Sequence, residues 1–247
     1  TYLFSAPAVG QTLDLQNALK EFPADVMLAD AAFLAAGWVH ELGGPPWAVL
    51  NPFAITLSGR NIAPFGMGQP PATTRIGRIR VRLLQEIGRR YSYRPSTRYV
   101  DQLRQQVGLP PTGEIFWDRT LSPFLYMQGS IRGLEYPRSD LPPQFHFIGP
   151  SISRGASTPF EPPEWWDDLQ SARHVVLVTQ GTLSNNPEQL LLPALRGLAA
   201  EDALIITTTG GGKLPETARS KVPANARVET FIPFEHLLPY VNLMVTN

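Results

Sequence analysis

Asp30 is the first residue whose type and position could support chemistry. It ends the short apolar run 25–30, which has the composition of a buried parallel strand. Ligands bind open parallel sheets beyond the carboxyl ends of the strands, so a carboxylate there is a candidate catalytic residue that could orient a histidine base. Asp30 could equally serve as the N-cap of a helix that starts at Ala31. The pattern by itself favours this second role.

Two glycine-containing turns follow other predicted strands and could bind phosphate. Gly181-Thr182 follows the β-branched run 175–179, and Gly210–Gly212 follows the run 203–209. Backbone N–H groups in such turns, with the threonine hydroxyl, can donate to a phosphate, although an ordinary tight turn explains Gly181-Thr182 as well. The second turn, which continues into Lys213, is not a P-loop, because Leu214 occupies the serine or threonine position. No G-x-G-x-x-G indicates a nicotinamide-binding domain.

The residue inventory excludes several other kinds of site. The 247 residues include no cysteine, and the four histidines, at positions 40, 146, 174 and 236, lack metal-ligand spacing. A disulfide framework and a cysteine nucleophile are therefore excluded, and a reducing compartment fits this composition. The formal net charge is zero, so no long-range field gathers nucleic acid or an anionic membrane. No apolar run is long enough to span a bilayer, which indicates a soluble, cytoplasmic protein.

A group of arginines is the one strongly basic stretch. These residues could form an RNA-binding face, but the neutral chain and the absence of interleaved aromatic side chains favour a solvated helix face. They are Arg75, Arg78, Arg80, Arg82, Arg89 and Arg90.

The elements that position these residues alternate as in an α/β protein. Hydrophobic periodicity predicts helices over 12–22, 31–42, 77–101 and 187–200, with a second helix that follows the third and runs to residue 107. Short apolar runs predict strands at 25–30, 47–50, 124–127, 145–148, 175–179, 203–209, 227–230 and 243–246. Strands separated by helices form parallel sheets. A stretch rich in serine, glycine and proline divides the chain, which predicts domains over 1–150 and 169–247 joined by a linker over 151–168.

Five segments of the sequence identify a protein family by their order and spacing, although none of them does so alone. They are 25–47, 134–150, 176–182 (VLVTQGT), 231–234 (FIPF) and 243–247 (LMVTN). In this order they resemble the nucleotide-sugar-dependent glycosyltransferases of the GT-B fold, of the bacterial macrolide and plant secondary-metabolite type. The resemblance covers essentially the whole chain. It implies two Rossmann-like domains that face each other across a cleft, both incomplete here because the sequence is cut at both ends.

The resemblance assigns roles to individual residues. Asp30 matches the acid that orients the catalytic histidine, and that histidine is expected upstream of Thr1, so the fragment alone is expected to be inactive. On the donor side, Thr182 matches the hydroxyl that contacts the diphosphate, Phe231 the aromatic ring that stacks on the base, and Ile232 the backbone beside that base. The expected donor site comprises Gly181, Thr182, Gly210, Phe231, Ile232 and Asn247. Asn247 stands where the family has a phosphate-contacting histidine, and it still donates a hydrogen bond.

The variable loop 51–68 matches the family's acceptor-side loop. It implies a pocket wall that contains Asn51, Phe53, Phe65 and Met67.

The expected reaction is an inverting transfer of a hexose or deoxyhexose from a UDP- or dTDP-sugar to a hydroxyl of a small, largely apolar natural product. The partners are this donor and acceptor, and neither a cofactor nor a metal is expected, because N–H groups and helix dipoles can stabilise the leaving diphosphate. Two alternatives stay open: a nucleotide-sugar epimerase of the same fold, and a non-catalytic nucleotide-sugar-binding protein.

Overall fold

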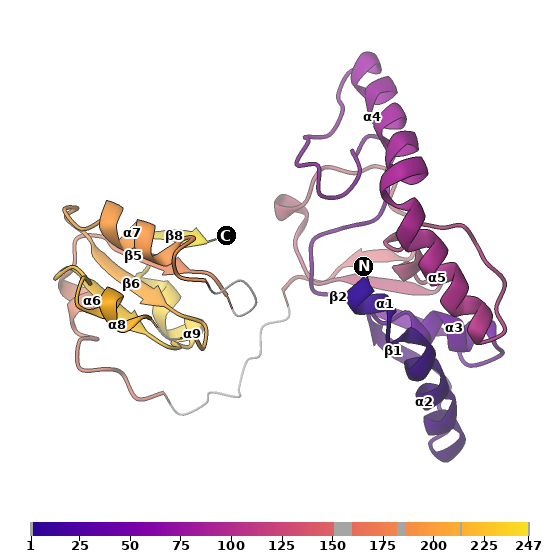
Figure 1. The fold of residues 1–247 in the computed structure, drawn as a ribbon, viewed down its shortest axis with the longest axis horizontal. Coiled ribbons are helices and arrows are strands. Elements are labelled where there is room, and N and C mark those ends of the chain that lie inside the picture. Colours follow the sequence, from indigo (N-terminus) through magenta and orange to yellow (C-terminus); the bar gives the residue numbers. More distant parts are fainter. Residues whose placement is uncertain (1, 151–159, 182–185, 213, 247) are drawn as a thin grey trace. The chain divides into compact units, whose positions relative to one another are not determined.

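Two compact units make up the chain, residues 1–153 and 154–247, and each has a parallel sheet with helices packed on it (Figure 1). The computed structural model describes residues 2–150, 160–181, 186–212 and 214–246. The predicted linker 151–168 is outside this part up to residue 159. From Phe160 onward its residues contact the second unit, since Phe160, Trp165 and Trp166 pack on that unit's hydrophobic core.

The sheet of the first unit has four parallel strands in the order β1-β2-β3-β4. These are β1 (Met27–Asp30), β2 (Trp47–Asn51), β3 (Leu125–Gln128) and β4 (Phe145–Phe147). The register aligns Asp30 with Leu50, and Asn51 with Gln128. All four strands were expected, and their carboxyl ends form one edge of the sheet.

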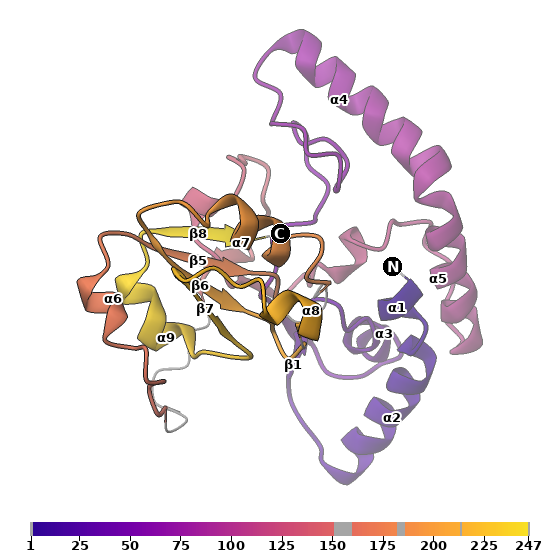
Figure 2. The same cartoon turned by 60° about the vertical axis from the view of Figure 1, so that its left-hand side comes forward.

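Helices of the first unit pack together beside the sheet (Figure 2). They are α1 (Tyr2–Ser5), α2 (Ala8–Glu21), α3 (Ala35–Glu41) and α5 (Arg94–Gln106), and α2 contacts both α3 and α5. Helices α2, α3 and α5 share a core with the segment that follows α5, built from the buried apolar side chains Ala8, Leu34, Trp38, Val100, Leu103, Leu109 and Phe116.

The predicted helix 31–42 is shorter than expected. Residues 31–33 form a turn, in which the N–H of Ala32 donates to Asp30 Oδ1 at 2.8 Å, and α3 begins only at Ala35. The helix ends at Glu41, and Gly43 follows it with a φ of 96°, which suits glycine, and donates its N–H to the carbonyl of His40.

The helical stretch 77–107, predicted to divide after residue 101, divides instead at residues 88–92. It consists of α4 (Arg75–Ile87), a π-helical turn (Gly88–Ser92) and α5. Thr74 caps α4, because its hydroxyl accepts from the N–H of Gly77 at 3.0 Å. Pro95 lies in the first turn of α5, where its missing N–H costs no helical hydrogen bond. Two short 3₁₀ turns, Asp118–Thr120 and Arg132–Leu134, lie before and after β3.

The second unit repeats the parallel α/β arrangement with strand order β7-β6-β5-β8. Its strands are β5 (Val175–Thr179), β6 (Leu204–Thr208), β7 (Ala226–Glu229) and β8 (Leu243–Thr246). Its helices are α6 (Asp168–Ser171), α7 (Leu191–Gly197), α8 (Glu216–Arg219) and α9 (Phe234–Leu237), with a 3₁₀ turn over Leu238–Tyr240. The predicted helix 187–200 begins later because residues 187–190 form turns.

The two central strands of the second unit are buried on both faces. Alternate residues of β5 and β6 enter two separate hydrophobic clusters, one with Leu169 and Leu237 and one with Leu191 and Leu195. This explains their continuous runs of β-branched and leucine residues. Among the described residues, no helix is long and apolar enough to cross a bilayer.

Candidate active site

Asp30 lies at the carboxyl end of the edge strand β1 and is exposed. Its Oδ1 accepts the N–H of Ala32, so the aspartate closes a turn rather than capping a helix that starts at Ala31. No hydrogen bond from Asp30 to a histidine is found among the described residues. The backbone therefore holds one carboxylate oxygen, and the exposed carboxylate keeps its other oxygen available to accept a hydrogen bond from another side chain.

A buried polar network lies beside Asp30 at the same sheet edge. Asn51, 2% exposed, donates from Nδ2 to Gln128 Oε1 at 2.9 Å. Gln128 in turn donates from Nε2 to the carbonyl of Phe53 at 2.6 Å. Glu135 accepts from the N–H of Ile55 at 3.2 Å and from Ser130 Oγ at 2.7 Å. The network therefore fixes the start of the loop that follows β2.

The phenol of Tyr126, on the neighbouring strand β3, stays neutral near neutral pH. Tyr126 has no exposed surface, and its ring stacks on Phe145 with centroids 4.9 Å apart. Burial raises the pKa of Tyr126 to about 12. Its role is therefore packing rather than proton transfer near neutral pH.

A cavity of about 950 Å³ opens next to the network in the first unit. Its walls come from the loop 54–69, from α4, and from the segments 113–118 and 134–136. Aromatic rings form part of the lining: Phe65, Tyr93, Trp117 and Tyr136. The Phe65 and Trp117 rings are 5.2 Å apart. Charged side chains, which include Arg82, Glu86, Arg89, Glu114, Asp118 and Glu135, also line it.

The four predicted acceptor residues occupy different places around this region. Phe65 lines the cavity. Asn51 is buried and supports the loop through Gln128. Phe53 and Met67 are 57% and 43% exposed and do not belong to the lining of the cavity. Their contact with an acceptor stays a prediction.

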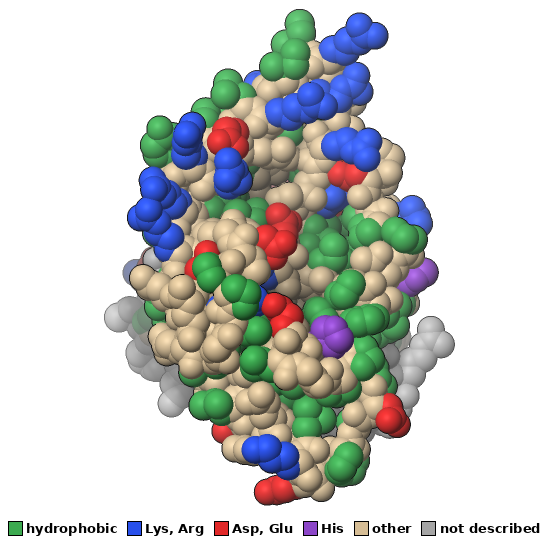
Figure 3. Space-filling view, turned by 90° about the vertical axis from the view of Figure 1, so that its right-hand side faces the viewer, with side chains coloured by type: hydrophobic (Ala, Val, Ile, Leu, Met, Phe, Trp, Pro, Cys, Tyr) green, Lys and Arg blue, Asp and Glu red, His purple; other side chains and the backbone are tan. Residues whose placement is uncertain are grey.

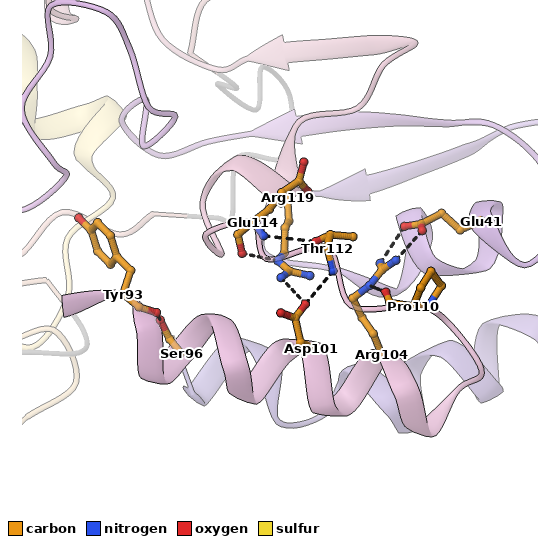
Figure 4. A network of polar contacts seen from close by, with 9 residues as sticks. All are labelled: Glu41, Tyr93, Ser96, Asp101, Arg104, Pro110, Thr112, Glu114 and Arg119. Atoms are coloured by element: carbon orange, nitrogen blue, oxygen red, sulfur yellow. Dashed lines mark hydrogen bonds and ion pairs between the residues drawn. The ribbon is translucent and has the colours of Figure 1, made fainter. Parts of the chain in front are cut away.

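Polar contacts hold the far wall of the cavity against α5 (Figure 4). Asp101 Oδ1 accepts from Arg119 Nη2 at 2.7 Å and from the N–H of Thr112 at 3.1 Å. Burial alone would raise the pKa of Asp101, but the hydrogen bond and charge of Arg119 bring that pKa below its usual value. Arg119 also donates from Nε to the carbonyl of Glu114 at 2.8 Å, which ties down the wall itself.

A second ion pair anchors the same helix. Arg104, only 2% exposed, donates two hydrogen bonds to Glu41 on α3, at 2.8 and 2.6 Å. It also donates to the carbonyl of Pro110 at 2.9 Å. Nothing in the sequence indicated these partners, since 63 residues separate Arg104 from Glu41.

The predicted donor residues of the second unit lie at the carboxyl ends of adjacent strands. Gly181 follows β5, Gly210 follows β6, and Phe231-Ile232 follows β7, so the strand order places the three turns next to one another. Phe231 is 73% exposed, whereas Ile232 is 2% exposed and anchors the turn in the core. Both glycines have positive φ, 67° and 60°, which favours glycine at these turns.

Threonines and a glutamine complete this edge. Thr208 donates to Thr179 Oγ1 at 2.8 Å, joining β6 to β5. Gln180 is 4% exposed, and neither its Oε1 nor its Nε2 has a hydrogen-bond partner among the described residues. A smaller cavity of about 370 Å³ lies at the ends of β6 and β7, with Thr209, Arg219 and Thr230 in its lining. Thr182 and Asn247 lie outside the described residues.

The two parallel α/β sheets with their helices have the architecture of a GT-B glycosyltransferase, the family to which the chain belongs. The solved glycotransferase of kitacinnamycin superposes with a TM-score of 0.69 at 22% sequence identity, over 98% of this chain and 57% of that one. This match confirms the fold that the sequence predicted.

Curated proteins confirm the sequence resemblance. The chain is 44% identical over 246 residues to 4'-demethylrebeccamycin synthase of Lentzea aerocolonigenes, covering 99% of this chain and 57% of that protein. It is 31% identical to UDP-glucosyltransferase B1 of Starmerella bombicola, covering 94% of this chain and 54% of that protein. The chain therefore spans about half the length of the curated relatives it matches. No protein-family model matches the sequence.

Proposed function

We propose that the protein is an inverting glycosyltransferase that moves a hexose or deoxyhexose from a UDP- or dTDP-sugar to a hydroxyl of a small, largely apolar natural product. The observation that carries this proposal is the position of the predicted residues. Asp30 ends a strand of one parallel sheet, and Gly181, Gly210 and Phe231 follow neighbouring strands of another. The similarity to named glycosyltransferases extends over nearly the whole chain.

In this mechanism a histidine is the base, and Asp30 stabilises the imidazolium that forms when this histidine takes up a proton. This base takes the proton of the acceptor hydroxyl as the oxygen attacks the anomeric carbon. The bond from that carbon to the diphosphate oxygen breaks, and the leaving diphosphate keeps the electron pair. The open side of the exposed Asp30 carboxylate supports this role, because a hydrogen-bonded carboxylate strengthens a histidine base.

The donor half of the proposal assigns the second unit to the nucleotide-sugar. The exposed ring of Phe231 would stack on the base, and backbone N–H groups around Gly181 and Gly210 would face the diphosphate. The reaction would need no metal, since these groups supply the electrostatic stabilisation. Activity that persists in excess EDTA would agree with this assignment, and activity restored only by a divalent cation would contradict it.

The acceptor half assigns the cavity of the first unit to the natural product. A volume of about 950 Å³ lies in the range of cavities that hold drug-sized ligands. Aromatic rings such as Phe65 and Trp117 favour an acceptor with a flat apolar part. We place the reaction in the cytoplasm, which the lack of cysteine supports.

The test is product formation by the protein expressed from its complete gene. It is incubated with UDP-, dTDP- and GDP-sugars and with phenolic, macrolide and sterol acceptors, and the products are weighed by mass spectrometry. A gain in acceptor mass of one hexose or deoxyhexose is the expected result. Interconversion of the free nucleotide-sugar without transfer would instead identify an epimerase. Donor binding without any product would identify a binding protein.

A further inference from the structure

Helix α4 has an apolar face that points away from its own unit. Ile76, Ile79, Leu83 and Ile87 follow one another at spacings of three, four and four residues, which puts them on one side of a helix. They are 81%, 65%, 60% and 43% exposed. We call these four residues the α4 stripe. Tyr91, in the π-helical turn that follows, is 72% exposed as well.

The contacts of α4 with the rest of the unit come from its other side. Val81 is 3% exposed. Gln85 Nε2 donates to the carbonyls of Gly59 and Ile62 at 2.6 and 2.7 Å. At 100° per residue these two positions lie roughly opposite the α4 stripe. A globular surface helix has the reverse arrangement, with its apolar stripe facing the core. The α4 stripe is therefore not explained by the packing of this unit.

Arginines accompany the stripe. Over α4 and the π-helical turn the chain carries six arginines and one glutamate, although its formal net charge is zero. All six arginines are exposed. Arg89 pairs with Glu86 at 2.8 Å, whereas Arg75 and Arg78 form no ion pair with the described residues. Figure 3 shows basic and hydrophobic side chains next to one another at the upper end of this face, where α4 lies.

We propose that α4 is an in-plane membrane helix that binds the surface of an anionic lipid bilayer. A helix with a strong apolar side, an arginine-rich polar side and low overall hydrophobicity lies in the interface, with its apolar side buried about 5–10 Å deep. The flanking arginines complement lipid phosphates, and each is worth about fivefold in binding near an anionic surface. A second copy of α4 fits less well, because it would bring two strongly cationic helices together.

The inference goes beyond sugar transfer and needs no donor or acceptor for its test. The purified chain is sedimented with vesicles of phosphatidylcholine alone and of phosphatidylcholine with phosphatidylglycerol. Binding at least tenfold stronger to the anionic vesicles, and weakened by high salt, is the expected result. Equal or no binding to the two kinds of vesicle would overturn the proposal.

Matched variants separate insertion of the stripe from a general surface effect. Leu83→Glu, on the stripe, should weaken vesicle binding by roughly tenfold or more. Leu13→Glu is the control, because Leu13 is also an exposed helical leucine, 51% exposed, of the same unit. If Leu83→Glu fails to fold, Ile76→Glu replaces it, since Ile76 is 81% exposed. Equal losses from the stripe and control variants would overturn the proposal.

Two further outcomes would identify a different occupant. Arg75→Glu combined with Arg78→Glu should also weaken vesicle binding. If this double variant binds more weakly while Leu83→Glu binds normally, charge attraction alone causes the binding, and the proposed burial of the α4 stripe is overturned. Analytical ultracentrifugation of the chain without vesicles is expected to show a sedimentation coefficient that Leu83→Glu leaves unchanged. A dimer that dissociates in Leu83→Glu would assign the stripe to a second copy and overturn the membrane proposal.

Discussion

Replacing Arg104 with alanine should destabilise the first unit far more than replacing Arg89 with alanine. The Arg104 side chain is 3% exposed and makes three hydrogen bonds, two of them to Glu41. Removing one partner of a buried ion pair costs about 3–5 kcal/mol. Glu41 is 42% exposed, so water can hydrate the carboxylate left behind, and we expect about 2–3 kcal/mol for Arg104→Ala.

Arg89 is the matched control because it also pairs with a carboxylate at 2.8 Å, that of Glu86. The side chains of Arg89 and Glu86 are 63% and 47% exposed, so Arg89→Ala should lower the free energy of unfolding by only about 0–0.5 kcal/mol. Hydrogen exchange of peptides from α3 and α5, read by mass spectrometry, measures the loss in opening free energy. Peptides from β5 and β6 serve as an internal reference in the other unit. Similar losses for the two variants would refute the burial argument.

Three further effects follow from the structure. The pKa of Asp101 is lowered in the folded protein, so its contribution to stability is full above the ordinary pKa of 3.8 and is lost as the pH falls through the lower folded pKa. In an acid titration, the stability of Asp101→Asn should therefore depend less on pH than that of the unchanged protein. An equal dependence on pH would contradict the ion pair with Arg119. Gly10→Ala should stabilise the chain by about 0.5–1 kcal/mol in urea unfolding, because Gly10 lies in a helix and the added Cβ meets open space. Gly44→Ala should instead destabilise the chain by about 1–3 kcal/mol, because its Cβ would lie 2.7 Å from a backbone oxygen. Phe231→Ala should weaken nucleotide-sugar binding by about 1–3 kcal/mol in calorimetry with the complete protein, while Phe22→Ala should not, and equal effects would remove Phe231 from the donor site.

Local sequence was enough to predict the strands. The runs 175–179 and 243–246 match β5 and β8 because β-branched and apolar residues flanked by turns leave few other choices. Boundaries of helices were less accurate. The helix after Asp30 starts four residues later than expected, since the aspartate closes a turn with Ala32 instead of capping the helix.

The residues that support the site could not be predicted from local pattern. Gln128 and Glu135 hold the loop after β2 through partners that lie 75 and 80 residues away along the chain. Only the folded sheet brings them together. The outward direction of the α4 stripe was also hidden, because a periodic apolar pattern identifies a helix face without showing which way that face points.

The role proposed for Asp30 is to support the base in a glycosyl transfer. The direct measurement is the steady-state rate and the donor dissociation constant of the complete protein and of its Asp30→Asn variant. If Asp30 has this role, Asp30→Asn lowers kcat by about 10²–10⁴-fold and leaves donor binding within about twofold. An unchanged kcat, or a loss of donor binding that accounts for the whole effect, would contradict it.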